Sequence, residues 1–131
     1  MLHPNEFGVN EAWIAFQLNE APISTQADGP FNCVALMDAA SCFLLAMAPV
    51  SASRAEPTEA EARQLLKGAL AHKKEWPKTL FVPTGYRVDT LVQEVERRGV
   101  AVVRVAEEQL ALILGGARES FREHFGGGVV H

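Results

Sequence analysis

The order of hydrophobic patterns along residues 31–125 is the feature that most limits how this chain can fold. Two short apolar runs, at 31–37 and 42–48, flank the sequence "DAAS" and are typical of strands buried on both faces. Helical and strand patterns then alternate along the chain, at 59–73, 79–82, 84–99, 100–105 and 107–125. Strands that alternate with helices pair in parallel through right-handed crossovers. The order therefore predicts an α/β fold, in which a mixed sheet opens with an antiparallel hairpin and alternating helices and strands follow.

The helix over 59–73 has the clearest signals. Thr58 and Glu61 form a capping box, in which each side chain accepts a hydrogen bond from a free backbone N–H at the helix start. An apolar stripe follows at helical spacing: Ala62, Leu65, Leu66, Ala69 and Leu70. Further on, each glycine of the pair at 115–116 weakens a helix by about 1 kcal/mol relative to alanine. Residues 107–125 are therefore expected to form either one helix or two.

The chain is long enough for a single core and is expected to form one domain. Residues 31–125 are the predicted α/β domain. Residues 1–30 are an N-terminal segment whose apolar stretch "AWIAFQL" (12–18) is either a strand or an arm docked on the domain. The glycine-rich end, 126–131, is expected to be a flexible tail.

Composition limits the class of partner. The chain carries 12 Lys and Arg against 16 Asp and Glu, a formal net charge of −4. Nucleic-acid binding is not expected, because it needs clustered cations. No apolar run reaches the length of a membrane span, and the N-terminus lacks the basic start and apolar core of a signal peptide. Cys33 and Cys42 are not in a C-x-x-C arrangement and are expected to be free buried thiols, which fits a cytoplasmic protein.

Asp38 interrupts the two apolar runs and is the first candidate for chemistry. At the end of a buried strand, its carboxylate could hold a divalent cation. It could equally open a tight turn that contains Ser41, accepting hydrogen bonds from the backbone beyond it. Turn formation accounts for the residue without any ligand, and it is the interpretation that we favour.

These residues also resemble a known family. An apolar strand that ends in Asp, then small residues, then a second apolar strand resembles the start of the ribonuclease-H-like fold, which integrases, transposases and actin-like ATPases share. The later order of helix, strand, helix, strand and helix is similar as well, so the resemblance covers about 31–125. The same organisation is similar to a bacterial domain family without an assigned activity.

The resemblance implies a place for metal ligands. Nucleases of this fold pair an Asp on the first strand with a second carboxylate at the end of the next core strand and a third on a following helix. Asp38 matches the first position, and Glu119 or Glu123 would match the third. At the second position, residues 82–84 read "VPT" and include no acid. Two-metal chemistry needs clustered acidic ligands around ions about 4 Å apart, so the predicted Mg²⁺ or Mn²⁺ site lacks one ligand.

A second candidate site lies at Thr84, Gly85 and Arg87, just before a predicted helix. Free N–H groups and the positive end of a helix can receive an anion, and Arg87 would add a cation. The alternative is that Thr84 or Gly85 only caps the helix, which every helix start requires.

Together these patterns favour a non-catalytic α/β domain that acts by binding another protein or a second copy of itself as a homodimer. In that case no cofactor is expected. The alternative is a metal-dependent nuclease or phosphoryl-transfer enzyme with the ribonuclease-H-like fold, for which Asp38 would be the principal ligand of Mg²⁺ or Mn²⁺. Whether the chain is an enzyme stays open at this point.

Overall fold

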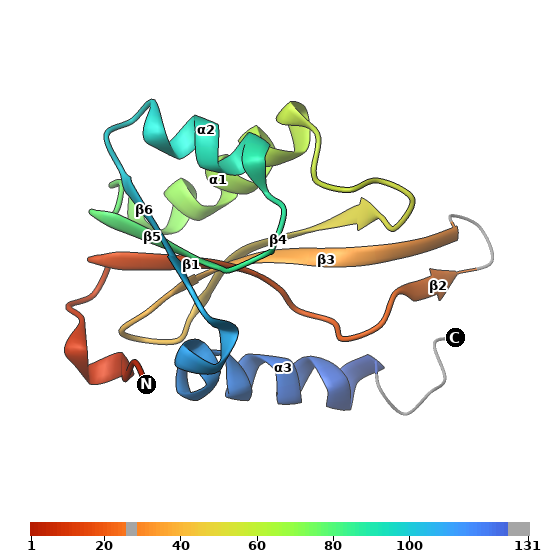
Figure 1. Ribbon diagram of the computed structural model, residues 1–131, viewed down its shortest axis with the longest axis horizontal. Helices are drawn as coiled ribbons and strands as arrows, with labels where there is room; N and C mark the ends of the chain where they lie inside the picture. The colour runs from red at the N-terminus through yellow and green to blue at the C-terminus, as the bar shows by residue number, and fades with distance from the viewer. Residues whose placement is uncertain (26–28, 126–131) are drawn as a thin grey trace.

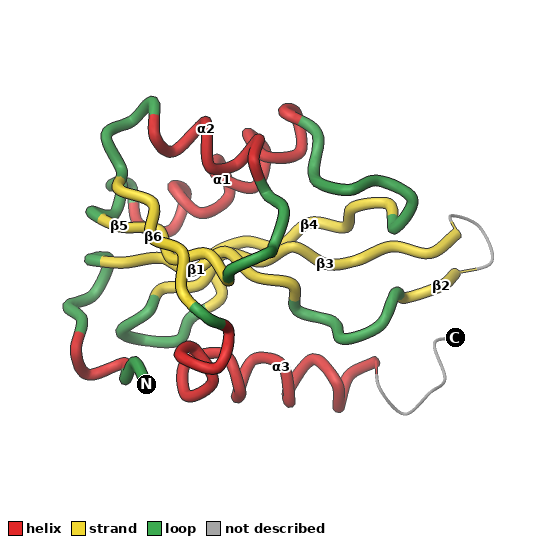
Figure 2. Tube along the Cα trace, viewed as in Figure 1, coloured by secondary structure: helices red, strands yellow, loops and turns green. Residues whose placement is uncertain are grey.

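A computed structural model describes residues 1–25 and 29–125 (Figure 1). The expected tail at 126–131 lies outside the described residues. The strands are β1 (Ala12–Gln17), β2 (Ile23–Thr25), β3 (Gly29–Asp38), β4 (Leu44–Ser51), β5 (Thr79–Pro83) and β6 (Ala101–Val105). The helices are α1 (Glu59–Lys73), α2 (Asp89–Glu96) and α3 (Ala111–Phe125), with short 3-10 turns η1 (Pro4–Glu6) and η2 (Glu107–Leu110). The strands form one mixed sheet, with α1 and α2 over one face and α3 over the other (Figures 1 and 2).

The strand β1 is central to the sheet. It pairs antiparallel with β3 on one side and parallel with β5 on the other, and β5 pairs parallel with β6. Along its other side β3 pairs antiparallel with β4, and beyond β1 it pairs with the short β2. The predicted hairpin is β3–β4, and the predicted parallel strands are β5 and β6. Residues 12–18 were expected to form either a strand or a docked arm, and the structure shows a strand. Residues before 31 are thus part of the same sheet as the predicted domain 31–125.

Each face of the sheet is buried by a different helical layer. Alternate residues of β1 point to opposite faces, so Trp13 and Ala15 pack with α1 and α2, whereas Ile14 and Phe16 pack with α3. All four of these side chains are fully buried. A strand covered on both faces must be apolar throughout, which is why "AWIAF" is an unbroken apolar run.

The strand β4 differs from its prediction as a fully buried strand. It lies at the edge of the sheet, and its buried and exposed residues alternate. Met47 is 56% exposed. Cys42 and Phe43 belong to the hairpin loop, because β3 ends at Asp38 and β4 begins at Leu44. A hydrogen bond from the Asp38 N–H to the Phe43 carbonyl, at 3.0 Å, closes this loop. Both cysteines are free, as expected, but only Cys33 is buried; Cys42 is partly exposed, contrary to the expectation of two buried thiols.

The predicted helices are all present, but α2 is much shorter than predicted: it spans Asp89–Glu96, whereas the pattern predicted 84–99. The capping box of α1 is formed in both directions, with bonds of 2.9 and 3.1 Å between Thr58 and Glu61. The last segment is the turn η2 followed by one helix, α3, which continues through the glycine pair at 115–116. Burial of Leu110, Ile113 and Leu114 against the sheet offsets the cost of the glycines. Within the described residues, no helix has the length and apolar character needed to cross a bilayer.

Candidate functional site

The parallel strands β1 and β5 end at the same edge of the sheet, which is where ligands bind in open α/β folds. Gln17 is the last residue of β1, and Pro83 is the last residue of β5. A cavity of about 350 Å³ lies at these strand ends, and we call it the strand-end cavity. Its lining combines amide, hydroxyl, carboxylate and guanidinium groups: Gln17, Asn19, Glu20, Pro83, Thr84, Tyr86, Glu107 and Arg118.

Arg118 brings a positive charge into the strand-end cavity from α3. Its Nε and Nη2 donate to the backbone oxygen of Gln17, at 3.2 and 3.0 Å. Nη2 also donates to Oε1 of Glu107, and the guanidinium carbon lies 5.6 Å from the centre of the Phe16 ring. Only 23% of the Arg118 side chain is exposed. The guanidinium is therefore fixed against β1 and η2 as well as by its own helix.

The amide groups at the end of β1 are used within the fold. Asn19 is buried, and its Oδ1 accepts a hydrogen bond from the Cys33 N–H at 2.7 Å. Its Nδ2 donates to the Ala21 carbonyl at 2.8 Å and to Oδ1 of Asn32 at 2.9 Å. Asn19 therefore fastens the segment after β1 onto β3, and its side-chain oxygen already accepts a bond from the backbone.

Thr84 and Gly85 form a turn after β5. The Thr84 N–H donates to the Val105 carbonyl at 2.8 Å and so continues the pairing of β5 with β6. Gly85 has a φ of +85°, which a residue with a side chain rarely adopts, and the Tyr86 N–H closes the turn on the Pro83 carbonyl at 3.1 Å. The sequence predicted that free N–H groups of these residues would bind an anion. The Thr84 N–H is not free for this, because it already donates to the sheet.

Arg87, the third residue of the expected anion site, belongs to a different contact. Its Nη2 lies 3.8 Å from a carboxylate oxygen of Glu56. The first turn of α2 contains Asp89, whose negative charge already complements the positive end of that helix. An anion at the start of α2 would meet this negative charge, and Arg87 does not line the strand-end cavity as Thr84 does. The anion site at Thr84, Gly85 and Arg87 stays a prediction.

Asp38 lies at the opposite end of β1 from the strand-end cavity, since its partner in the β1–β3 register is Trp13. The carboxylate is fully buried. Its Oδ1 accepts from the Asn10 N–H at 2.8 Å, and its Oδ2 accepts from the N–H and the hydroxyl of Ser41, at 3.0 and 2.7 Å. Asp38 thus closes the β3–β4 turn and holds the loop before β1.

Glu119 and Glu123 are exposed on α3, and neither lines the strand-end cavity. Successive helix residues point apart by about 100°, so Glu119 turns away where Arg118 faces β1. Within the described residues, no three His, Cys, Asp or Glu side chains are placed to hold one metal ion. The structure therefore does not bring Asp38, Glu119 and Glu123 together.

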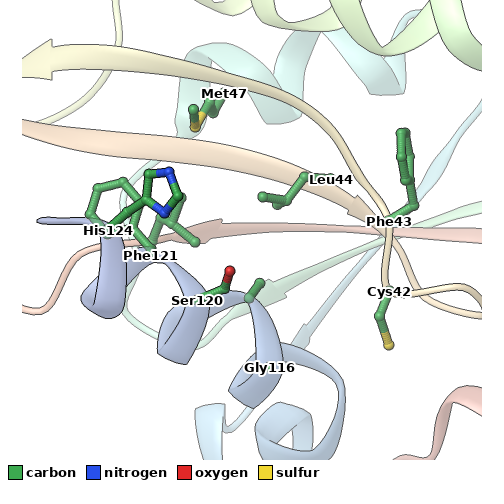
Figure 3. Close-up of a pocket in the computed structure, with 10 residues that line it drawn as sticks. Cys42, Phe43, Leu44, Met47, Gly116, Ser120, Phe121 and His124 are labelled. Atoms are coloured by element: carbon green, nitrogen blue, oxygen red, sulfur yellow. The ribbon is translucent and has the colours of Figure 1, made fainter.

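A second hollow, of about 490 Å³, lies between the edge strand β4 and the second half of α3. We call it the edge groove. Figure 3 shows Leu44 and Met47 on its strand side, with Ser120, Phe121 and His124 on its helix side. The full lining is mainly apolar: Leu18, Cys42, Phe43, Leu44, Met47, Gly116, Ala117, Ser120, Phe121 and His124.

Solved structures with a similar fold are retroviral integrases. The chain matches the simian T-cell lymphotropic virus intasome in complex with PP2A regulatory subunit B56 gamma, with a TM-score of 0.53 and 14% identity over 97% of this chain and 43% of that one. It also matches the HTLV-2 integrase catalytic core domain in complex with magnesium, in a dimeric form, with a TM-score of 0.53 and 9% identity over 85% of this chain and 84% of that one. The chain thus spans less than half of the intasome chain. No protein-family model and no curated protein matches the sequence.

These likenesses and the strand order show that the chain has a ribonuclease-H-like fold. They also correct the assignment of the first strand. The first core strand is β1, not the strand that ends in Asp38, because β1 is the one that pairs with parallel β5. The strand ends at which the resemblance places acids carry Gln17 and Asn19 at the end of β1, and Pro83 and Thr84 at the end of β5.

This set of donors does not suit a pair of divalent ions. The carboxylates that line the strand-end cavity are Glu20 and Glu107, and Glu107 is already bonded to Arg118.

Sequence reasoning missed Arg118, although a signal was present. Leu110 and Leu114 lie on the buried stripe of the last segment, and Arg118 follows Leu114 by the same step of four residues.

Replacement of Asp38 by Asn tests its structural role. Both carboxylate oxygens of Asp38 accept hydrogen bonds, but Asn offers only one acceptor oxygen. The amide nitrogen of Asn would face an N–H group, and two donors cannot bond to each other. We expect the free energy of unfolding of Asp38→Asn to fall by about 1–3 kcal/mol in urea titrations. Ser41→Ala, which removes a single hydroxyl, should cost less. If Mn²⁺ raises the melting temperature of the native chain but not of Asp38→Asn, the metal-ligand interpretation is right instead.

Tyr86 allows a pH test, since it is the one tyrosine of the chain. Burial raises the pKa of its phenol, and the nearby Arg118 charge opposes part of the rise. We expect tyrosinate absorbance in the folded protein only at a pH well above the ordinary value of about 10. The unfolded chain releases this proton first. Stability from the group is therefore complete below about pH 10 and falls as the pH rises further.

A phenylalanine variant separates the phenol from the ring. The Tyr86 hydroxyl is buried and has no hydrogen-bond partner among the described residues. Tyr86→Phe should therefore keep the fold and unfold with a free energy equal to or up to ~1 kcal/mol above the native value. A clear loss of stability would show that the hydroxyl makes a bond, and the expected pH dependence would then need another cause.

Proposed function

We propose that this chain is a non-catalytic domain of ribonuclease-H-like fold that acts through protein contact, by pairing with a second copy of itself at the edge groove. The observation that carries the proposal is the apolar side-chain surface that the described residues form between β4 and α3. Met47 is 56% exposed on the strand side, and a Cβ added at Gly116 on the helix side would meet no atom of residues 1–25 and 29–125 within 4 Å. An open apolar surface next to a sheet edge is typical of an interaction site.

The backbone of β4 limits how a partner can approach. Cys33 of β3 directs its N–H to Asn19 and its carbonyl to the Leu18 N–H, both away from β4. Pro49, the residue opposite Cys33, therefore directs its own backbone toward the outer edge, where proline has no N–H to donate. A long strand added to this edge would be interrupted at Pro49. Side-chain packing in the edge groove is thus the better mode of contact than extension of the sheet.

The comparisons support the proposal in a general way. The HTLV-2 integrase core that resembles this chain was solved in a dimeric form. Domains with this fold can therefore self-associate. In a symmetric pair, the same surface is used by both copies, so a single self-complementary apolar groove is sufficient.

Sedimentation of surface variants tests this contact. We expect the native chain to sediment as a dimer at high protein concentration and Met47→Glu to sediment as a monomer with the same melting temperature, because a carboxylate would be buried in the interface. Val103→Glu is the matched control, since Val103 is 40% exposed on β6 at the other edge of the sheet. A native chain that stays monomeric, or equal effects of the two variants, would contradict self-association at the edge groove.

A second candidate is metal-dependent phosphoryl transfer, which the likeness to a magnesium-bound integrase core favours. The strand-end cavity is the part of the fold in which it would take place. DNA cleavage with Mg²⁺ or Mn²⁺ by the native chain, lost in Glu107→Gln and kept in Asp38→Asn, would establish this activity. We expect no cleavage, since Arg118 already binds the Glu107 carboxylate.

A further inference from the structure

We infer that Arg118 takes the place of a divalent cation in the strand-end cavity, so that internal ion pairs complete this edge of the fold. The guanidinium donates hydrogen bonds to the same classes of oxygen that Mg²⁺ and Mn²⁺ prefer as ligands, a carbonyl oxygen and a carboxylate. These are the Gln17 carbonyl at the end of β1 and the Glu107 carboxylate on η2. The inference is independent of whether the chain self-associates.

The charges at this edge are balanced within the chain. Arg118 and Arg122 are four residues apart on α3 and so lie on one side of the helix. Arg118 pairs with Glu107, and the Nη2 of Arg122 lies 3.5 Å from Oε1 of Glu20. The two carboxylates that line the cavity are thereby matched by two arginines. A divalent ion would have to displace a guanidinium and would be repelled by it in a site partly shielded from water.

Packing of α3 explains why Arg118 reaches this position. Leu110 and Leu114 are buried against the sheet, and Arg118 follows on the same face one turn later. The aliphatic stem can thus cover apolar surface while the guanidinium lies over the Phe16 ring. The stem of Arg118 is thus positioned by α3 and its guanidinium by Phe16 and Gln17, so the side chain is a fixed part of the site.

A set of variants can restore a metal ligand with and without this charge. Thr84 lies at the end of β5, lines the cavity and is exposed, so Thr84→Asp adds the acid that the fold lacks there. Combined with Arg118→Gln, which keeps a donor for the Gln17 carbonyl but removes the charge, it leaves two carboxylates without a guanidinium. We expect this double variant to bind Mn²⁺ at least ~10-fold more tightly than the native chain or either single variant.

The control for this pair is Thr84→Asp with Arg118→Lys, which keeps a positive charge but loses the planar fork. It should not bind Mn²⁺ more tightly than the native chain. Binding is read from the electron paramagnetic resonance signal of free Mn²⁺ and from the shift in melting temperature on Mn²⁺ addition. Circular dichroism confirms that each variant is folded. Arg118→Gln alone should melt at a lower temperature than the native chain.

Two results would overturn the inference. One is equal Mn²⁺ binding by Thr84→Asp with Arg118 present and by the double variant, since the guanidinium would then not hold the cation position. The other is Mn²⁺ binding by the native chain that is weakened in Arg118→Gln, which would make Arg118 a support for a metal site. Should Arg118→Gln fail to fold, the comparison of Thr84→Asp with its Arg118→Lys form decides: strong binding by either variant contradicts the inference.

Discussion

Burial of β1 on both faces is the constraint on which the rest of the structure depends. Trp13 and Ala15 pack with α1 and α2, and Ile14 and Phe16 pack with α3, so neither layer can form its core without this strand. The same strand joins the antiparallel half of the sheet to the parallel half, through β3 on one side and β5 on the other. Since its side chains and both of its edges are used, β1 fixes the positions of all the elements around it.

The position of β1 also separates Asp38 from the edge of the sheet at which ligands bind in this kind of fold. Its carboxyl end faces the strand-end cavity, where Arg118 binds Gln17 and Glu107. Its amino end is held by Asp38, which is buried and accepts bonds from Asn10 and Ser41. A carboxylate buried for turn formation thus lies at one end of the sheet, and a guanidinium lies at the end where the fold places chemistry.

The two outer edges of the sheet are protected differently. At β4, Pro49 removes an N–H from the outer edge and disfavours further strand pairing, and the apolar edge groove lies beside it. At β6, the exposed residues are Ala101, Val103 and the charged Arg104, and Val103 is the one large apolar side chain among them. This asymmetry directs the proposed protein contact to the β4 edge. Among the described residues, none lines both the edge groove and the strand-end cavity.

Local sequence determined the elements whose signals lie within a few residues of one another. The capping box at Thr58, the apolar stripe of α1, the β3–β4 hairpin and the alternation that follows all rest on such local signals, and the fold class follows from their order. The role of "AWIAFQL" could not be decided locally, because an unbroken apolar run fits a central strand and a docked arm equally well. The site depended on that choice. Which strand is central decides which residues end at one edge, and only tertiary packing brings Arg118 to Gln17, 101 residues apart in the chain.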